Sequence, residues 1–114
     1  ELSRHEPMLH ADVRRTIRLL LLSRRCSRAD VARRLGIHPR TLGRRLQESG
    51  TTFQALLDDM RAQRAKHLLL DTFLPVARIA AAVGYEDPTI FSRAFARWTG
   101  RTPSAFRAEL VARA

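Results

Sequence analysis

One helical pattern occurs twice in the sequence, about fifty residues apart, and this repeat limits the folds that the chain can adopt. The first copy, residues 30–46, reads DVARRLGIHPRTLGRRL, and the second, residues 78–95, reads RIAAAVGYEDPTIFSRAF. In each copy an apolar residue is followed by a small alanine, two variable positions, an apolar residue and a glycine. A turn and a second short helical segment come next. This order is typical of a helix-turn-helix unit, so the sequence predicts two of them.

The two copies align closely, with a small change of register inside the turn. One extra residue enters the second turn near Glu86 and Asp87, which raises the offset between the copies from 48 to 49 residues. The aligned pairs include Gly36 with Gly84, Leu42 with Phe91 and Leu46 with Phe95. Because apolar positions correspond throughout, we expect both units to bury the same faces.

Apolar periodicity and capping signals predict an all-α chain with seven helices and no strand. The first helix is indicated by Val13, Ile17, Leu20 and Leu21. Other starts are indicated by caps and first-turn prolines, and helix ends by glycines. We expect helices over residues 8–23, 28–35, 39–48, 53–71, 75–84, 88–98 and from 103 onward. The fold predicted is a homeodomain-like pair of units, about 28–48 and 76–99, joined by the long helix 53–71.

The long helix 53–71 sets the separation that the two units can reach. Its apolar residues are expected on one side; they are Phe53, Leu56, Leu57, Met60 and Leu68. At 1.5 Å per residue the helix is ~28 Å long, while successive major-groove entries lie ~34 Å apart. The shortfall suggests a hypothesis: bound DNA bends toward the protein, or only one unit docks fully.

The charge of the chain indicates a polyanionic partner. The formal net charge is +10, and 20 of the 21 basic residues are arginine, the exception being Lys66. Nucleic acid or an anionic membrane surface would attract such a chain. No apolar run approaches the ~18 residues that span a bilayer, and the start lacks a signal-peptide pattern. With Cys26 as the single cysteine, no intrachain disulfide can form.

Helical spacing predicts which side chains face outward for reading DNA. In the first unit they are Arg40, Gly43, Arg44 and Gln47, spaced i, i+3, i+4 and i+7. In the second they are Thr89, Ser92, Arg93 and Ala96, each 49 residues later. Both faces carry a central arginine, and arginine is the usual partner of guanine O6 and N7. Because Gly43 has no side chain, readout in the first unit is expected from Arg40, Arg44 and Gln47.

Phosphate contacts are expected beside these faces and at helix N-termini, where backbone N–H groups attract anions. The candidate residues are Thr41, Arg45, Thr52, Arg97, Arg101 and Thr102. Residues 24–45 hold eight arginines and one acid, Asp30.

Residues 80–107, which read AAAVGYEDPTIFSRAFARWTGRTPSAFR, resemble the signature of the AraC/XylS family of bacterial transcription regulators. In that signature Gly, an aromatic residue, Phe-x-Arg-x-Phe, Gly and Pro recur at these spacings. The resemblance extends over roughly residues 10–110. It implies a DNA-binding domain whose two recognition helices enter successive major grooves, with Arg40, Gly43, Arg44, Thr89, Ser92 and Arg93 at base-reading positions. Gly43 departs from the longer polar residues often found there.

The resemblance also implies partners and a cellular setting. Family members usually activate promoters by touching RNA polymerase, and usually carry a separate effector-binding or dimerising domain before this one. The chain has no initiator methionine, so we expect a C-terminal piece whose N-terminal effector domain is missing. A bacterial cytoplasmic, nucleoid-associated location is implied, and no cofactor.

Other residues that carry chemistry receive structural interpretations. The four histidines form no metal-ligand pattern, and His38 is expected to cap a helix or contact a phosphate. Asp58 and Asp59 are expected to be surface charges, or a contact for a basic protein surface. Phe91, Phe95 and Trp98 are expected in the core rather than as a base-stacking platform.

Three function classes remain open at this point. The first is a sequence-specific transcription regulator, the second a nonspecific architectural DNA binder, and the third a helical module that meets an acidic protein or a membrane. An enzyme is disfavoured because no Ser/His/Asp set or glycine-rich phosphate loop is evident.

Overall fold

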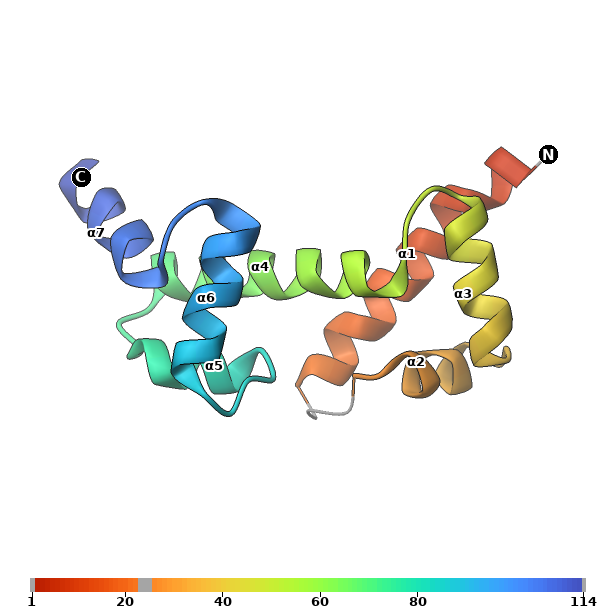
Figure 1. The fold of residues 1–114 in the computed structure, drawn as a ribbon, viewed down its shortest axis with the longest axis horizontal. Helices are drawn as coiled ribbons and strands as arrows, with labels where there is room; N and C mark the ends of the chain where they lie inside the picture. Colours follow the sequence, from red (N-terminus) through yellow and green to blue (C-terminus); the bar gives the residue numbers. More distant parts are fainter. Residues whose placement is uncertain (1, 23–25, 114) are drawn as a thin grey trace. The chain divides into compact units, whose positions relative to one another are not determined.

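The computed structural model describes residues 2–22 and 26–113, and these residues form seven α-helices and no strand (Figure 1). In chain order the helices are α1 (Leu2–Leu21), α2 (Arg28–Leu35), α3 (Pro39–Glu48), α4 (Phe53–Asp71), α5 (Val76–Ala82), α6 (Pro88–Thr99) and α7 (Pro103–Arg113). The chain divides into two compact units, Glu1–Met60 (unit 1) and Arg61–Ala114 (unit 2). The all-α fold with two helix-turn-helix units, α2–α3 and α5–α6, is therefore confirmed.

The same hydrogen bond closes the turn in both helix-turn-helix units. In unit 1 the Ile37 backbone N–H donates to the carbonyl of Ala32 at 3.0 Å, and in unit 2 Tyr85 donates to Ala80 at 2.9 Å. Both alanines are fully buried. The glycine before each donor has a positive φ, 73° at Gly36 and 93° at Gly84, a conformation that costs a residue with a Cβ atom more than glycine. The repeated sequence pattern thus produces a repeated backbone turn.

Helix starts are held by the side chains that the sequence predicted. The Ser27 hydroxyl accepts from the Asp30 N–H at 3.1 Å, and an Asp30 carboxylate oxygen accepts from the Ser27 N–H at 3.3 Å, which completes a capping box. The His38 ring Nδ1 accepts from the Arg40 N–H at 3.1 Å. In unit 2 the Asp87 carboxylate accepts from the Thr89 N–H at 2.8 Å.

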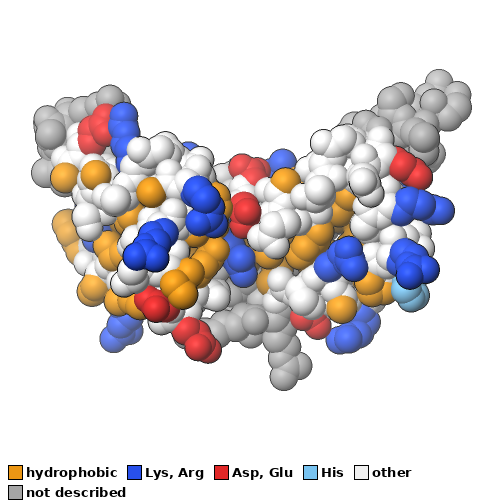
Figure 2. Space-filling model, viewed as in Figure 1, with side chains coloured by type: hydrophobic (Ala, Val, Ile, Leu, Met, Phe, Trp, Pro, Cys, Tyr) orange, Lys and Arg blue, Asp and Glu red, His pale blue; other side chains and the backbone are white. Residues whose placement is uncertain are grey.

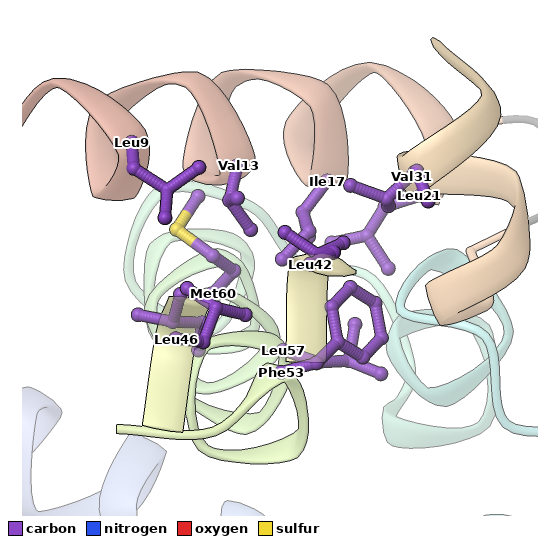
Figure 3. Close-up of a cluster of buried hydrophobic side chains, with 12 residues drawn as sticks. Leu9, Val13, Ile17, Leu21, Val31, Leu42, Leu46, Phe53, Leu57 and Met60 are labelled. Carbon is purple, nitrogen blue, oxygen red and sulfur yellow. The ribbon is translucent and has the colours of Figure 1, made fainter. Parts of the chain in front are cut away.

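Unit 1 has its own hydrophobic core, formed by α1, α2, α3 and the first half of α4. Figure 3 shows the α1 side chains pointing toward those of α3 and α4. Val13, Ile17, Leu42 and Leu46 are completely inaccessible to solvent, which fixes the rotation of α1 and α3 about their axes. At roughly 1.5–3 kcal/mol per fully buried aliphatic side chain, this cluster is the main stabilising term of the unit.

Unit 2 has a second core that is rich in aromatic rings. Phe91 and Phe95 of α6 are fully buried, and their ring centroids lie 5.9 Å apart. Phe106 of α7 packs edge-on against Phe95 at 5.6 Å, and Tyr85 lies 6.0 Å from Trp98. The expectation that Phe91, Phe95 and Trp98 belong to the core is confirmed, with Trp98 partly buried.

Helix α1 begins at Leu2, six residues before the start that the sequence indicated, and ends at Leu21. The prediction relied on the apolar stripe, which begins near Leu9 and so could not mark a start ahead of it. The last residue of the predicted range, residue 23, lies outside the described residues.

The expectation for α4 is incomplete, because the helix buries further residues beyond the five that the sequence indicated. Phe53, Leu56, Leu57 and Met60 belong to the core of unit 1, but Leu68 packs against that of unit 2. The fully or nearly buried residues of the second half are Ala62, Ala65 and Leu69. The step of two residues from Met60 to Ala62 breaks the i, i+3, i+4 rhythm, and Ala65 and Leu69 further along α4 belong to the core of unit 2.

Candidate nucleic-acid interface

Helix α3 presents a polar, arginine-bearing face because its opposite face is fixed in the core of unit 1. Leu42 and Leu46 are fully buried, so the residues on the opposite side of the helix point outward. Arg40, Arg44 and Gln47 are exposed, and Gly43 between them is partly covered. The structure therefore presents the predicted outward residues of the first unit on one face.

These residues line one open depression of about 480 Å³ on unit 1. Its lining comprises Arg28, Arg40, Gly43, Arg44, Gln47, Thr52 and Phe53. All four predicted base-reading positions of α3 and the predicted phosphate contact Thr52 thus share one surface. Three arginines converge there, so the depression suits an anionic or hydrogen-bond-accepting ligand.

Arg44, the central arginine of this surface, makes only a weak ion pair. Its guanidinium Nε lies 3.7 Å from a carboxylate oxygen of Glu48, one turn further along α3, and both side chains are largely solvated. An exposed ion pair of this kind is worth about 0–1 kcal/mol. Arg44 can therefore exchange Glu48 for an external acceptor at little cost.

Two predicted phosphate contacts of α3 lie away from that depression. Arg45 lines a separate, smaller depression of about 200 Å³, together with residues of α1 and of the α2–α3 turn such as Asp12 and Ile37. Thr41 is partly buried and lines neither depression. A phosphate contact at Arg45 would belong to a different surface of unit 1 from the contacts at Arg40 and Arg44.

Helix α6 of unit 2 repeats the arrangement with smaller side chains. Phe91, Ala94 and Phe95 are buried, while Thr89 and Arg93 are exposed and Ser92 and Ala96 are half-buried. The Thr89 N–H is already engaged by the Asp87 cap, but its hydroxyl remains at the surface. Arg93 is the long cationic side chain among the four predicted outward positions.

The predicted phosphate contacts differ in how they are engaged within the protein. The Thr52 and Thr102 hydroxyls accept from the N–H groups of Ala55 and Ala105, at 3.0 and 3.1 Å, and so cap α4 and α7. Each hydroxyl keeps its own proton for donation to an external acceptor. Arg97 is exposed, whereas Arg101 is engaged in an ion pair with Glu109 of α7.

Basic side chains are visible on the surface of each unit in Figure 2, with fewer acidic ones among them. This distribution agrees with the formal net charge of +10. The surface of each unit would therefore attract an anionic ligand, and this electrostatic attraction would weaken as salt is added.

Sequence reasoning missed Arg28 as a member of the first surface. It is the first residue of α2, is exposed, and lines the depression beside Arg40 and Arg44. A signal for Arg28 was present in the alignment of the two copies. The first copy has Arg28 where the second has the apolar Val76, and it has Gly43 where the second has the polar Ser92.

The other polar residues that the sequence singled out have structural roles. His38 caps α3 as expected. An oxygen of Asp59 accepts from Arg14 of α1 at 2.7 Å, which joins α1 to α4 within unit 1, and Asp58 accepts from Gln54 at 2.9 Å. Within residues 2–22 and 26–113, no cluster of three or more His, Cys, Asp or Glu side chains could hold a metal ion. No helix in this part of the chain is long and apolar enough to cross a membrane.

Comparison with known proteins places these surfaces in a family. A family model described as a helix-turn-helix domain matches residues 31–109. Over 77 residues the chain is 47% identical to an uncharacterized HTH-type transcriptional regulator of Mycobacterium tuberculosis, a match that covers 68% of this chain. It covers 22% of the regulator, so the matched chain spans about a fifth of that relative's length.

Solved structures of DNA-binding proteins share the fold. A DNA-binding transcriptional dual regulator from Escherichia coli K-12 has a TM-score of 0.82 at 26% identity, covering 89% of this chain and 90% of that one. The DNA-binding domain of AdpA, a global transcriptional factor solved in complex with a target DNA, has a TM-score of 0.73 at 26% identity. That match covers 89% of this chain and 94% of the AdpA domain.

Proposed function

Because the chain belongs to the AraC/XylS family and is the DNA-binding domain of a transcription regulator, we propose that it reads a specific operator with α3 and α6 in successive major grooves. The observation that carries this proposal is the clustering of Arg40, Arg44 and Gln47 on one exposed surface of α3. Arg93 supplies the matching cation on α6.

The proposed division of labour follows the two units. Residues 28–48 form the first docking unit, residues 76–99 the second, and the helix 53–71 is the linker between them. Arg40, Gly43, Arg44 and Gln47 face base edges from α3, and Thr89, Ser92 and Arg93 from α6. Phosphates are contacted by Thr41, Arg45, Thr52, Arg97, Arg101 and Thr102. To contact a phosphate, Arg101 would exchange its ion pair with Glu109 for the external anion.

Selection of bound duplexes from a random pool, followed by footprinting, tests this function. We expect one enriched sequence, protected over two segments about one duplex turn apart, and bound 10³-fold or more tightly than random DNA at fixed salt. Salt-dependent binding with no enriched sequence would instead identify a nonspecific architectural binder. Failure to bind any duplex at low salt would leave an acidic protein or a membrane as the partner.

The length of α4 supports the bending hypothesis. The helix has 19 residues, which gives ~28 Å, shorter than the ~34 Å between successive groove entries. We expect bound DNA to bend toward the protein, or one unit to dock incompletely. Circularly permuted probes of the selected operator test this: a bend makes mobility depend on the position of the site, and equal mobility contradicts bending.

The remaining proposals rest on the family rather than on particular residues. We propose RNA polymerase as a protein partner, dimerisation and effector binding through a separate domain, no enzymatic activity, and a bacterial cytoplasmic location at the nucleoid, where duplex DNA is found.

A further inference from the structure

The guanidinium of Arg28 lies over Gly43, on the recognition face of α3. A Cβ atom placed on Gly43 would stand 3.1 Å from Nη1 of Arg28, 3.8 Å from its Cζ and 3.9 Å from its Cδ. The side chain of Arg28 thus fills the space into which a side chain at position 43 would grow. Both residues line the same open depression with Arg40 and Arg44.

The fold places Arg28 there from a rigid base. It is the first residue of α2, directly after the Ser27 cap and its reciprocal bonds with Asp30. Helix α2 is in turn fixed against α3 because Val31, Ala32 and Leu42 are fully buried in the same core. The exposed arginine therefore starts from a fixed backbone position beside the centre of the recognition face.

The second unit shows the opposite arrangement at the two equivalent positions. Before the turn the offset between the copies is 48 residues, so Arg28 corresponds to Val76, which packs partly buried against the core of unit 2. After the turn the offset is 49, so Gly43 corresponds to Ser92, which has a polar side chain of its own. At these two positions the first copy has a long cation, Arg28, and a residue without a side chain, Gly43. The second copy has an apolar residue, Val76, and a polar side chain, Ser92.

We propose that Arg28 supplies the base-reading side chain that Gly43 lacks, so that the first unit reads DNA with Arg28, Arg40 and Arg44. The inference rests on the function proposed above. A guanidinium at this place offers two parallel donors, which suit the O6 and N7 acceptors of guanine in the major groove. The guanidinium of Arg28 occupies the space beside Gly43, so the first surface has three arginines rather than two.

Base-resolved binding of Arg28→Ala tests the proposal, with Arg34→Ala as the matched control. Arg34 is also exposed on α2 and loses the same charge on substitution, but it does not line the depression. Each protein is measured against the selected operator and its single-base variants at fixed salt. We expect Arg28→Ala to lose about tenfold to 100-fold of its discrimination at one base pair, and Arg34→Ala to keep the wild-type pattern.

Two results would overturn the assignment. An unchanged base preference in Arg28→Ala means that the guanidinium does not read DNA. An equal loss on every sequence, with a shallower dependence on salt, means that it contacts a phosphate instead. If the wild-type protein itself prefers no sequence, the proposed function fails, and this outcome is distinct from a failure of Arg28 alone.

A second variant tests whether Arg28 acts from its place over Gly43. Leucine at position 43 is a good helix former but must displace the guanidinium. We expect Gly43→Leu to lose preference at the same base pair as Arg28→Ala, and Arg28→Ala to change nothing further in the Gly43→Leu background. If Arg28→Ala costs as much discrimination in that background as in the wild type, the two positions act independently and the proposal is wrong. Far-UV circular dichroism and the melting temperature establish that each variant is folded.

Discussion

At the scale of single residues, arginine has several different physical tasks in this chain. Arg14 binds the carboxylate of Asp59 within unit 1, and Arg61 lies over the ring of Tyr85 in unit 2, 5.0 Å from its centroid. Arg107 donates to backbone carbonyls, whereas Arg40 and Arg44 face solvent. The basic composition predicted a polyanionic partner. Only the packed structure separates the arginines that stabilise the fold from those that can meet DNA.

The capping box at Ser27 yields a stability prediction. Ser27→Ala removes the acceptor for the Asp30 N–H and should lower the free energy of unfolding by about 0.5–2 kcal/mol. Chemical denaturation followed by circular dichroism measures the change. Ser104→Ala, at an exposed position of α7, is the control and should be nearly neutral. Equal effects of the two substitutions would show that the cap contributes nothing.

Local residue roles were predictable because they depend on spacing along the chain. The Ser27–Asp30 box, the His38 cap and the Asp87 cap each join residues two or three positions apart. The approach of Arg28 to Gly43 was not predictable in this way, since it depends on how α2 packs across α3. Sequence periodicity reports which face of a helix points outward, but not which neighbour reaches over that face.

At the scale of helices, the sequence predicted the ends of α4 correctly but identified only part of its buried surface. Its predicted bounds, 53 and 71, are those observed, because Thr52 caps the start locally. Its apolar face was predicted as one stripe, yet the burial pattern changes after Met60. A helix shared between two cores has two buried sets, and a single-stripe interpretation cannot represent both.

Helix α7 stabilises the end of α4 through one side chain. Arg107 donates from Nε to the carbonyl of Leu69 at 3.2 Å, from one terminal nitrogen to Leu74 at 2.7 Å and from the other to Thr72 at 3.3 Å. Leu69 lies in the last turn of α4, where carbonyls have no partner inside the helix. Because these partners are 33–38 residues away in sequence, no local pattern predicted them.

Removing that side chain should destabilise unit 2. Arg107→Ala is expected to lower the free energy of unfolding by about 1.5–3 kcal/mol, because three carbonyls lose a charged donor. Arg107→Lys should recover less than half of the loss, since an ammonium group cannot match the planar fork. Guanidinium chloride unfolding provides the values. Full recovery by lysine would mean that positive charge alone matters at this position.

At the scale of the whole molecule, the chain has two hydrophobic cores and one continuous helix that contributes to both. The first core contains aliphatic residues of α1 to α4, and the second contains the aromatic residues of α6 and α7. The repeat in the sequence predicted two helix-turn-helix units, but not that each unit has a hydrophobic core of its own. We expect the two units to have separable local stabilities.

A cavity in one core tests this separation. Leu46→Ala removes a fully buried side chain from unit 1 and should cost about 2–5 kcal/mol. Native-state hydrogen exchange should show a larger loss of protection in α1–α3 than in α5–α7. The control is Leu70→Ala, at a half-exposed position, which should change little. An equal loss of protection in both units would mean that the chain unfolds as one cooperative block.

The paired variants Arg44→Ala and Arg93→Ala give the most direct measurement of whether both helix-turn-helix units read DNA. Each is titrated against the selected operator and all of its single-base variants at fixed salt. We predict that each variant loses about 1–3 kcal/mol of discrimination at a different base pair, and that the two base pairs lie about 10 bp apart. If either variant instead weakens binding to every sequence equally, its arginine does not read bases, and recognition by two duplicated helices is contradicted.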